Sequence, residues 1–222
     1  MRNNRGWCEL KLLRGSTYAA WLLLSFGIAL GGVWAYEVLG GGGYWAWDPV
    51  ETASLLPWFF LTALFYVNHI TKSKSFSREF MILLTFASLV FLSALTRGGV
   101  TQSVHSYAIS PVGSIMMVFA LGMIIYFFYL KRLKRQPLFK LEFDKSYLHS
   151  RSAFIIFGAL IFIAMVCFVG LAFPNFSYNY WTFPFVLALI AGLIGYSLNE
   201  NAPFARLVLL TIGGLAAGFV AS

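Results

Sequence analysis

The stretch FIIFGALIFIAMVCFVGLAF, residues 154–173, runs for a full membrane thickness without a charged side chain. The hydrocarbon core of a bilayer requires roughly 20 apolar residues per helix, so this run predicts a membrane-spanning helix. Continuous apolar runs favour helices over a barrel, whose strands alternate and are about half as long. We therefore predict an all-α polytopic integral membrane bundle, with residues 1–222 in a single membrane domain. About seven transmembrane helices are expected, near residues 17–39, 54–71, 80–96, 112–130, 153–173, 181–198 and 204–221.

The composition of the whole chain supports this class. Apolar residues make up 59% and charged residues 11% of the 222 residues, and the mean hydropathy is +0.77. Soluble domains carry about 25% charged residues, so an ordinary soluble protein is excluded. The first apolar run is too long and too rich in glycine for a typical cleaved signal peptide.

The chain has a net charge of +8, and its basic residues are distributed according to the topology of the predicted helices. In a seven-span arrangement, 15 of the 16 basic residues fall on one side, many of them in a loop at 131–151, and Arg97 alone falls on the other. The positive-inside rule then predicts a cytoplasmic N-terminus and places residues 40–53, 97–111 and 174–180 outside. The basic side is expected to contact membrane lipid, and no nucleic-acid partner is expected.

The two cysteines do not suggest a reactive site. Cys8 is predicted to lie on the cytoplasmic side and Cys167 inside the fifth span. Such a pair predicts neither a disulfide nor a zinc site, and both cysteines are interpreted as structural.

The sequence GGGYWAWDPVE, residues 41–51, connects the first two predicted helices. Its glycines end the first helix, and Asp48 followed by proline is a typical helix start. Because Glu51 stands three residues after Asp48, the pair predicts a capping box.

Three aromatic side chains of this connection, Tyr44, Trp45 and Trp47, have no such role in starting or ending a helix. Aromatic residues are common at the membrane interface, and this explains one or two of them. A cluster after four glycines also suits a platform for a flat ligand. The residues alone leave both interpretations open.

A second predicted external loop, TRGGVTQSVHSYAISP at 96–111, contains Arg97 and His105. A loop histidine is often merely solvated, but a neutral imidazole is also an axial ligand of haem iron, and haem is a large flat ligand. Arg97 suits a carboxylate such as a haem propionate. His69, near the cytoplasmic end of the second span, is either an intramembrane functional group or an unremarkable interfacial histidine. His149, in the basic loop, is expected to be solvated.

Two of these segments resemble a known family. GGGYWAWDPVETASLLPW (41–58) resembles the tryptophan-rich "WWD" signature of the haem-handling superfamily of cytochrome c biogenesis, which includes CcmF, CcmC and CcsA. LTRGGVTQSVHSYA (95–108) resembles the loop of the CcmF branch that carries an external histidine. The resemblance assigns residues 31–111 to the haem-handling region and residues 152–222 to C-terminal helices.

The resemblance implies a haem b cofactor held by a component of a haem lyase (cytochrome c synthase), rather than by a complete enzyme. Trp45, Trp47 and Asp48 match the platform, and His105 matches an external haem-iron ligand. It further implies a protein of the inner cell membrane, or of the mitochondrial inner membrane in an organelle, with the WWD loop on the outer side. There haem is presented for attachment to the CxxCH motif of apocytochrome c.

The chain also departs from the family pattern. Gly41 and Tyr44 stand where tryptophan is usual, and Ala46 stands where an aromatic residue is usual. Tyr66 aligns with a buried histidine that ligates a structural haem in the family, so His69, one turn further on, becomes a candidate replacement.

The partner of the His105-type ligand lies, in the family, in a loop two helices before the WWD signature. Only about 16 residues precede the first predicted span, so we expect either a split protein, in which another maturation subunit supplies that second external histidine, or an incomplete chain. A haem carrier protein is a further expected partner. Two alternatives remain: a CcmC-type protein that hands haem to a carrier without ligation, and a non-haem membrane scaffold.

Overall fold

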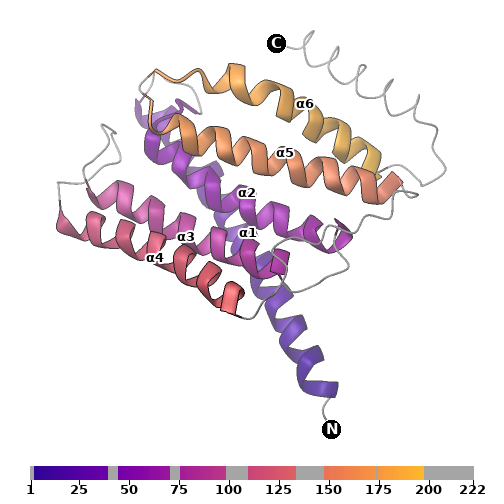
Figure 1. Cartoon of the computed structure of the whole chain (residues 1–222). Coiled ribbons are helices and arrows are strands. Elements are labelled where there is room, and N and C mark those ends of the chain that lie inside the picture. The colour runs from indigo at the N-terminus through magenta and orange to yellow at the C-terminus, as the bar shows by residue number, and fades with distance from the viewer. Residues whose placement is uncertain are drawn as a thin grey trace.

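The computed structural model describes residues 3–39, 45–70, 76–98, 110–133, 148–173 and 175–197. All regular secondary structure in these ranges is helical, which confirms the predicted all-α class (Figure 1). The helices are α1 (Asn3–Leu39), α2 (Pro49–Ile70), α3 (Phe76–Gly98), α4 (Pro111–Leu133), α5 (Leu148–Gly170) and α6 (Tyr178–Ser197).

Each of these helices contains a segment that is long and apolar enough to cross a membrane. The segments are Gly15–Val38, Pro49–Val67, Arg78–Gly98, Pro111–Leu133, Arg151–Gly170 and Tyr178–Ser197. The chain is therefore an integral membrane protein, and six of the predicted spans are confirmed. The predicted span at 204–221 lies outside the described residues.

Helix α2 is central to the arrangement of the bundle. It packs against α1, α3 and α5, while α4 packs against α3 and α6 against α5. In Figure 1 the helices follow one another in the order α4, α3, α2, α5, α6, and α1 crosses obliquely behind α2. The core lies chiefly between α2 and α5 and includes Leu56, Ala63, Val67, Ile156, Leu160 and Cys167. Cys167 is a buried free thiol, in agreement with its predicted structural role.

Two tryptophans attach α1 to α2. The indole N–H of Trp21 donates to Thr62 Oγ1 at 2.9 Å, and the indole N–H of Trp58 donates to Ser25 Oγ at 2.8 Å. Each hydroxyl then donates to a carbonyl of its own helix, from Ser25 to Trp21 O and from Thr62 to Trp58 O. A bilayer interior supplies no water to satisfy an indole N–H, so this reciprocal pairing removes a desolvation cost while it joins the helices.

Small residues bring α3 and α4 into close contact. A Cβ atom added to Gly113 would collide with the Cα of Gly98 and lie 2.9 Å from the carbonyl oxygen of Ala94. Close backbone approach at small residues is a common way to pack membrane helices. At the other end of the same pair, the Lys131 ammonium forms an ion pair with Glu79.

The connections α1–α2, α3–α4 and α5–α6 share one end of the bundle, on the left in Figure 1. We call this the loop end; its described residues are 45–48, 97–98, 110–113, 171–173 and 175–178. The sequence predicted that the segments 40–53, 97–111 and 174–180 lie together, and their described parts do. Which side of the membrane the loop end faces stays a prediction.

Candidate functional site

Asp48 caps the first turn of α2, as predicted. Its Oδ2 accepts the N–H of Val50 at 2.9 Å and the N–H of Glu51 at 3.5 Å. Its carbonyl oxygen accepts the N–H of Thr52 at 2.8 Å, which is the first bond of the helix. The carboxylate thereby satisfies backbone donors that have no partner within a helix, and Pro49 removes another.

Glu51 acts differently from the predicted capping box. In that motif the glutamate accepts the N–H of the cap residue itself. Here Glu51 Oε2 accepts the N–H of Ala46 at 3.0 Å, two residues before Asp48. The side chain therefore holds the connection that leads into α2 as well as the helix end.

Trp47 lies between Ala46 and Asp48, and its backbone has a positive φ of 57°. Its ring stacks on Tyr178 of α6, with ring centroids 4.9 Å apart and an interplanar angle of 6°. Its indole N–H donates to Asn179 Oδ1 at 2.8 Å. Trp47 thus has a structural role that the sequence did not predict, because its side chain joins α6 to the start of α2.

Trp45 contacts Trp47 edge to face, with centroids 6.2 Å apart and an interplanar angle of 87°. The indole nitrogen of Trp45 is buried and has no hydrogen-bond partner among the described residues. Its ring borders a pocket of about 300 Å³ against the glycine-rich face of α1. The lining is Leu24, Gly27, Ile28, Gly31, Gly32, Trp34, Trp45, Glu51 and Ser54.

The glycines of α1 keep this pocket open. A Cβ atom added to Gly27 or Gly31 would meet no atom within 4 Å. Larger residues at these positions would project into the space beside Trp45. The arrangement offers a floor of helix backbone at the glycines and a tryptophan wall.

The remaining predicted site residues are distributed as follows. Arg97 lies in the last turn of α3 at the loop end, with an exposed side chain. Tyr44 and His105 lie outside the described residues. His69 lies in the last turn of α2, about 30 Å along the helix from Asp48 at 1.5 Å per residue, and its side chain is outside the described set. The backbone of His69 therefore lies at the opposite end of α2 from Asp48.

Sequence reasoning missed Tyr178 and Asn179. Both lie within the aromatic-rich segment FPNFSYNYW at 173–181, and that density of rings was the available signal. Within the part of the chain that the structure describes, no group of three or more His, Cys, Asp or Glu side chains could hold a metal ion.

The comparisons with known proteins agree with this architecture. Residues 9–96 match the family model "Cytochrome C assembly protein", and this range includes most of α1, the aromatic connection, α2 and most of α3. The chain belongs to the cytochrome c assembly protein family. Tyr178 and Asn179 lie beyond the region that the family model matches.

Relatives of the family were found in several bacteria. The cytochrome c-type biogenesis protein ccl1 of Rhodobacter capsulatus is 34% identical over 179 residues, which are 76% of this chain and 26% of the relative. CcmF of Pseudomonas fluorescens is 44% identical over 109 residues, 47% of this chain and 16% of the relative. CcmF of Escherichia coli is 39% identical over 118 residues, 52% of this chain and 18% of the relative. The chain thus spans about a quarter or less of these relatives, and no solved structure matches it.

Proposed function

We propose that this cytochrome c assembly protein is a haem-binding membrane subunit of a cytochrome c haem lyase. It presents haem b on the outer membrane face for covalent attachment to the CxxCH motif of apocytochrome c. The observation that carries the proposal is the aromatic connection itself. Trp47 is held by α6, Glu51 and Asp48 fix the backbone on either side of it, and Trp45 borders an open pocket.

The residues of the site fit one edge of a haem. Trp45 supplies an apolar wall and a donor for a propionate oxygen, and the glycine face of α1 admits a flat ring. A pocket of about 300 Å³ is at the lower limit for small-molecule sites, so it accommodates part of a macrocycle. The rest of the haem would be held by Trp47, Tyr44, Arg97 and His105, and by a partner chain.

These groups indicate which part of the chemistry the haem supplies and which part the protein supplies. The haem supplies the vinyl groups and the iron, and the protein supplies orientation and electrostatics. His105 is proposed as the axial ligand of the iron and Arg97 as the partner of a propionate. Asp48 holds the loop in place through the helix cap. His69 is retained as a candidate ligand of a separate haem at the opposite end of α2.

The proposed location is the inner cell membrane of a bacterium, or the inner mitochondrial membrane in an organelle. The basic residues predict that the loop end faces outward. The partners proposed are a maturation subunit with a second external histidine, a haem carrier protein and apocytochrome c.

The test is the substitution His105→Ala in the full chain, expressed with its maturation partners, with His149→Ala as the matched control. We expect His105→Ala to reduce the Soret band of the purified protein and to abolish the formation of c-type cytochrome, whereas His149→Ala leaves both unchanged. Unchanged haem content and cytochrome level in His105→Ala would contradict the proposal.

A reconstitution separates ligation from delivery. Haem-loaded protein is mixed with apocytochrome c, and haem that remains attached after denaturing electrophoresis is measured. Covalent haem supports the lyase subunit. Transfer of haem without any covalent product instead supports the CcmC-type delivery function.

A further inference from the structure

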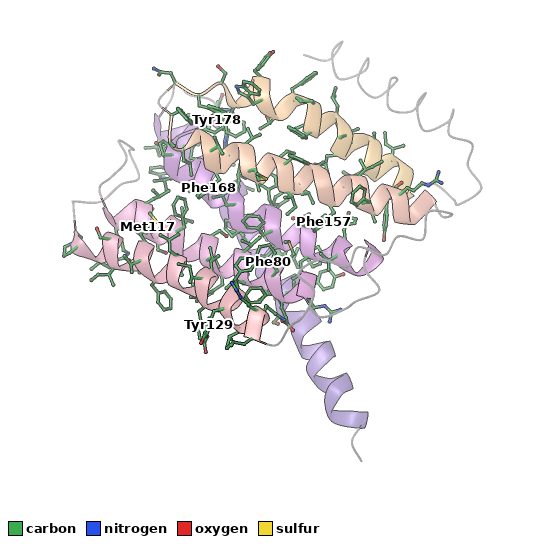
Figure 2. All side chains as sticks on the ribbon, viewed as in Figure 1. Phe80, Met117, Tyr129, Phe157, Phe168 and Tyr178 are labelled. Atoms are coloured by element: carbon green, nitrogen blue, oxygen red, sulfur yellow. The ribbon has the colours of Figure 1, made fainter. Side chains whose placement is uncertain are left out.

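The α5–α6 connection reaches the aromatic loop from a distant part of the chain. Trp47 and Asn179 are 132 residues apart in sequence, yet the indole N–H of Trp47 donates to the side-chain oxygen of Asn179. The next residue back, Tyr178, stacks on the same indole with nearly parallel rings. Figure 2 shows Tyr178 at the end of the bundle where α5 meets α6. One ring face and the one polar atom of Trp47 are therefore both held by α6.

We propose that Tyr178 and Asn179 are positioning residues that fix the ring plane of Trp47, so that the start of α6 is part of the ligand platform. The inference rests on the proposed haem function where it concerns the ligand. The contacts themselves do not depend on that function.

Tyr178 occupies a fitted slot. It is 7% exposed, and its ring meets Phe176 edge to face with centroids 4.9 Å apart. A Cβ atom added to Gly170 would collide with the Tyr178 ring and lie 2.6 Å from Cδ1 of Phe176. The absence of a side chain at Gly170 is thus what admits the tyrosine, and the ring is almost fully buried there.

A stacked ring can either position its neighbour or occupy the place of an absent flat ligand. The tight packing of Tyr178 distinguishes these two roles. A side chain that takes the place of an absent flat ligand must leave when the ligand arrives. Because Tyr178 is enclosed by Gly170 and Phe176, it stays in place. A flat ligand would therefore have to reach Trp47 from ring surface that Tyr178 does not cover.

The two residues contribute in different ways. Stacking on Tyr178 sets the tilt of the indole, and the bond to Asn179 sets its rotation within that plane. Trp47 sits at a positive φ, which few non-glycine residues adopt without support, so the side-chain contacts also hold the backbone. Loss of either contact should loosen the connection between Ala46 and Asp48.

The experiment compares Tyr178→Ala, Tyr178→Phe and Asn179→Leu in the full purified chain. Tyr180→Ala is the matched control, because Tyr180 is the neighbouring aromatic residue of α6 and is 74% exposed. The first measurement needs no haem: amide hydrogen exchange of the peptide that contains Ala46, whose N–H is bound to Glu51. The second is the affinity for added haem b, followed by its Soret absorbance.

We expect Tyr178→Ala and Asn179→Leu to speed exchange in this peptide roughly tenfold and to weaken haem binding by a similar factor. Tyr178→Phe keeps the stacked ring and should retain most of the protection from exchange and most of the haem affinity, and Tyr180→Ala should match the original chain in both measurements. Exchange within α3 and α4 should stay unchanged in every variant, which confirms that the bundle is folded.

Unchanged exchange in Tyr178→Ala and Asn179→Leu would overturn the positioning role. Tighter haem binding in Tyr178→Ala would overturn it too, because the tyrosine would then be competing with the ligand. If exchange rises as expected but haem affinity is unaffected, even by Trp47→Ala, the positioning of the loop stands and the haem function of the platform fails.

Discussion

At the scale of single residues, Asp48 either only caps α2 or also contacts the ligand through its negative charge. One pair of substitutions separates these two roles. Its carboxylate caps α2 through the N–H groups of Val50 and Glu51. We expect Asp48→Ala to lower the free energy of unfolding by about 1 kcal/mol, the usual effect of removing an N-cap. Reversible unfolding in mixed detergent micelles measures this loss.

The matched substitution is Asp48→Asn. Asparagine caps helices as well as aspartate, so this variant should keep both the stability and the haem content of the original chain. Loss of haem from a stable Asp48→Asn protein would mean that the negative charge contacts the ligand, and the role of Asp48 as a cap alone would be refuted.

At the scale of elements, the sequence predicted those structural features that depend on residues adjacent in the chain. The spans follow from apolar runs, and the cap at Asp48 follows from two adjacent residues, so both could be predicted. The bond from Ala46 to Glu51 could not, because it requires the positive φ of Trp47 in between. The stack of Trp47 on Tyr178 could not either, because it depends on which helices end together, and periodicity carries no such information.

The contact between α3 and α4 supports a second prediction at this scale. Gly113 meets the backbone at Gly98, whereas a Cβ atom at Gly122 of the same helix would meet nothing within 4 Å. Alanine is the better helix former by about 1 kcal/mol, so Gly122→Ala should be neutral or slightly stabilising. Gly113→Ala should instead destabilise the protein by about 1–3 kcal/mol, because backbone atoms cannot move aside as a side chain can.

The melting temperature in detergent, compared between the two glycine variants, checks this expectation. The same variants also concern the candidate site, since Gly98 and Gly113 stand on either side of the segment that carries His105. We expect weaker haem binding in Gly113→Ala only. Equal melting temperatures for the two variants would show that α3 and α4 do not pack as closely as described.

At the scale of the whole molecule, the basic residues at the two ends of the bundle predict the orientation of the chain in the membrane. Arg97 is at the loop end, while Lys131 and Arg132 lie in the last turn of α4 at the opposite end. The positive-inside rule therefore directs the loop end outward, which is the side where the proposed function requires it. Orientation can be measured without haem or partners, so it tests the location separately from the chemistry.

Single cysteines on α4 provide that measurement, in a background with Cys8→Ser and Cys167→Ala. Val112→Cys lies at the loop end and Leu133→Cys at the other, and the native side chains are 43% and 62% exposed. In spheroplasts, a membrane-impermeant maleimide should label Val112→Cys at once and Leu133→Cys only after lysis. The reverse pattern would place the tryptophan loop in the cytoplasm, where it could not present haem to an exported apocytochrome, and the haem lyase proposal would have to be abandoned along with the orientation.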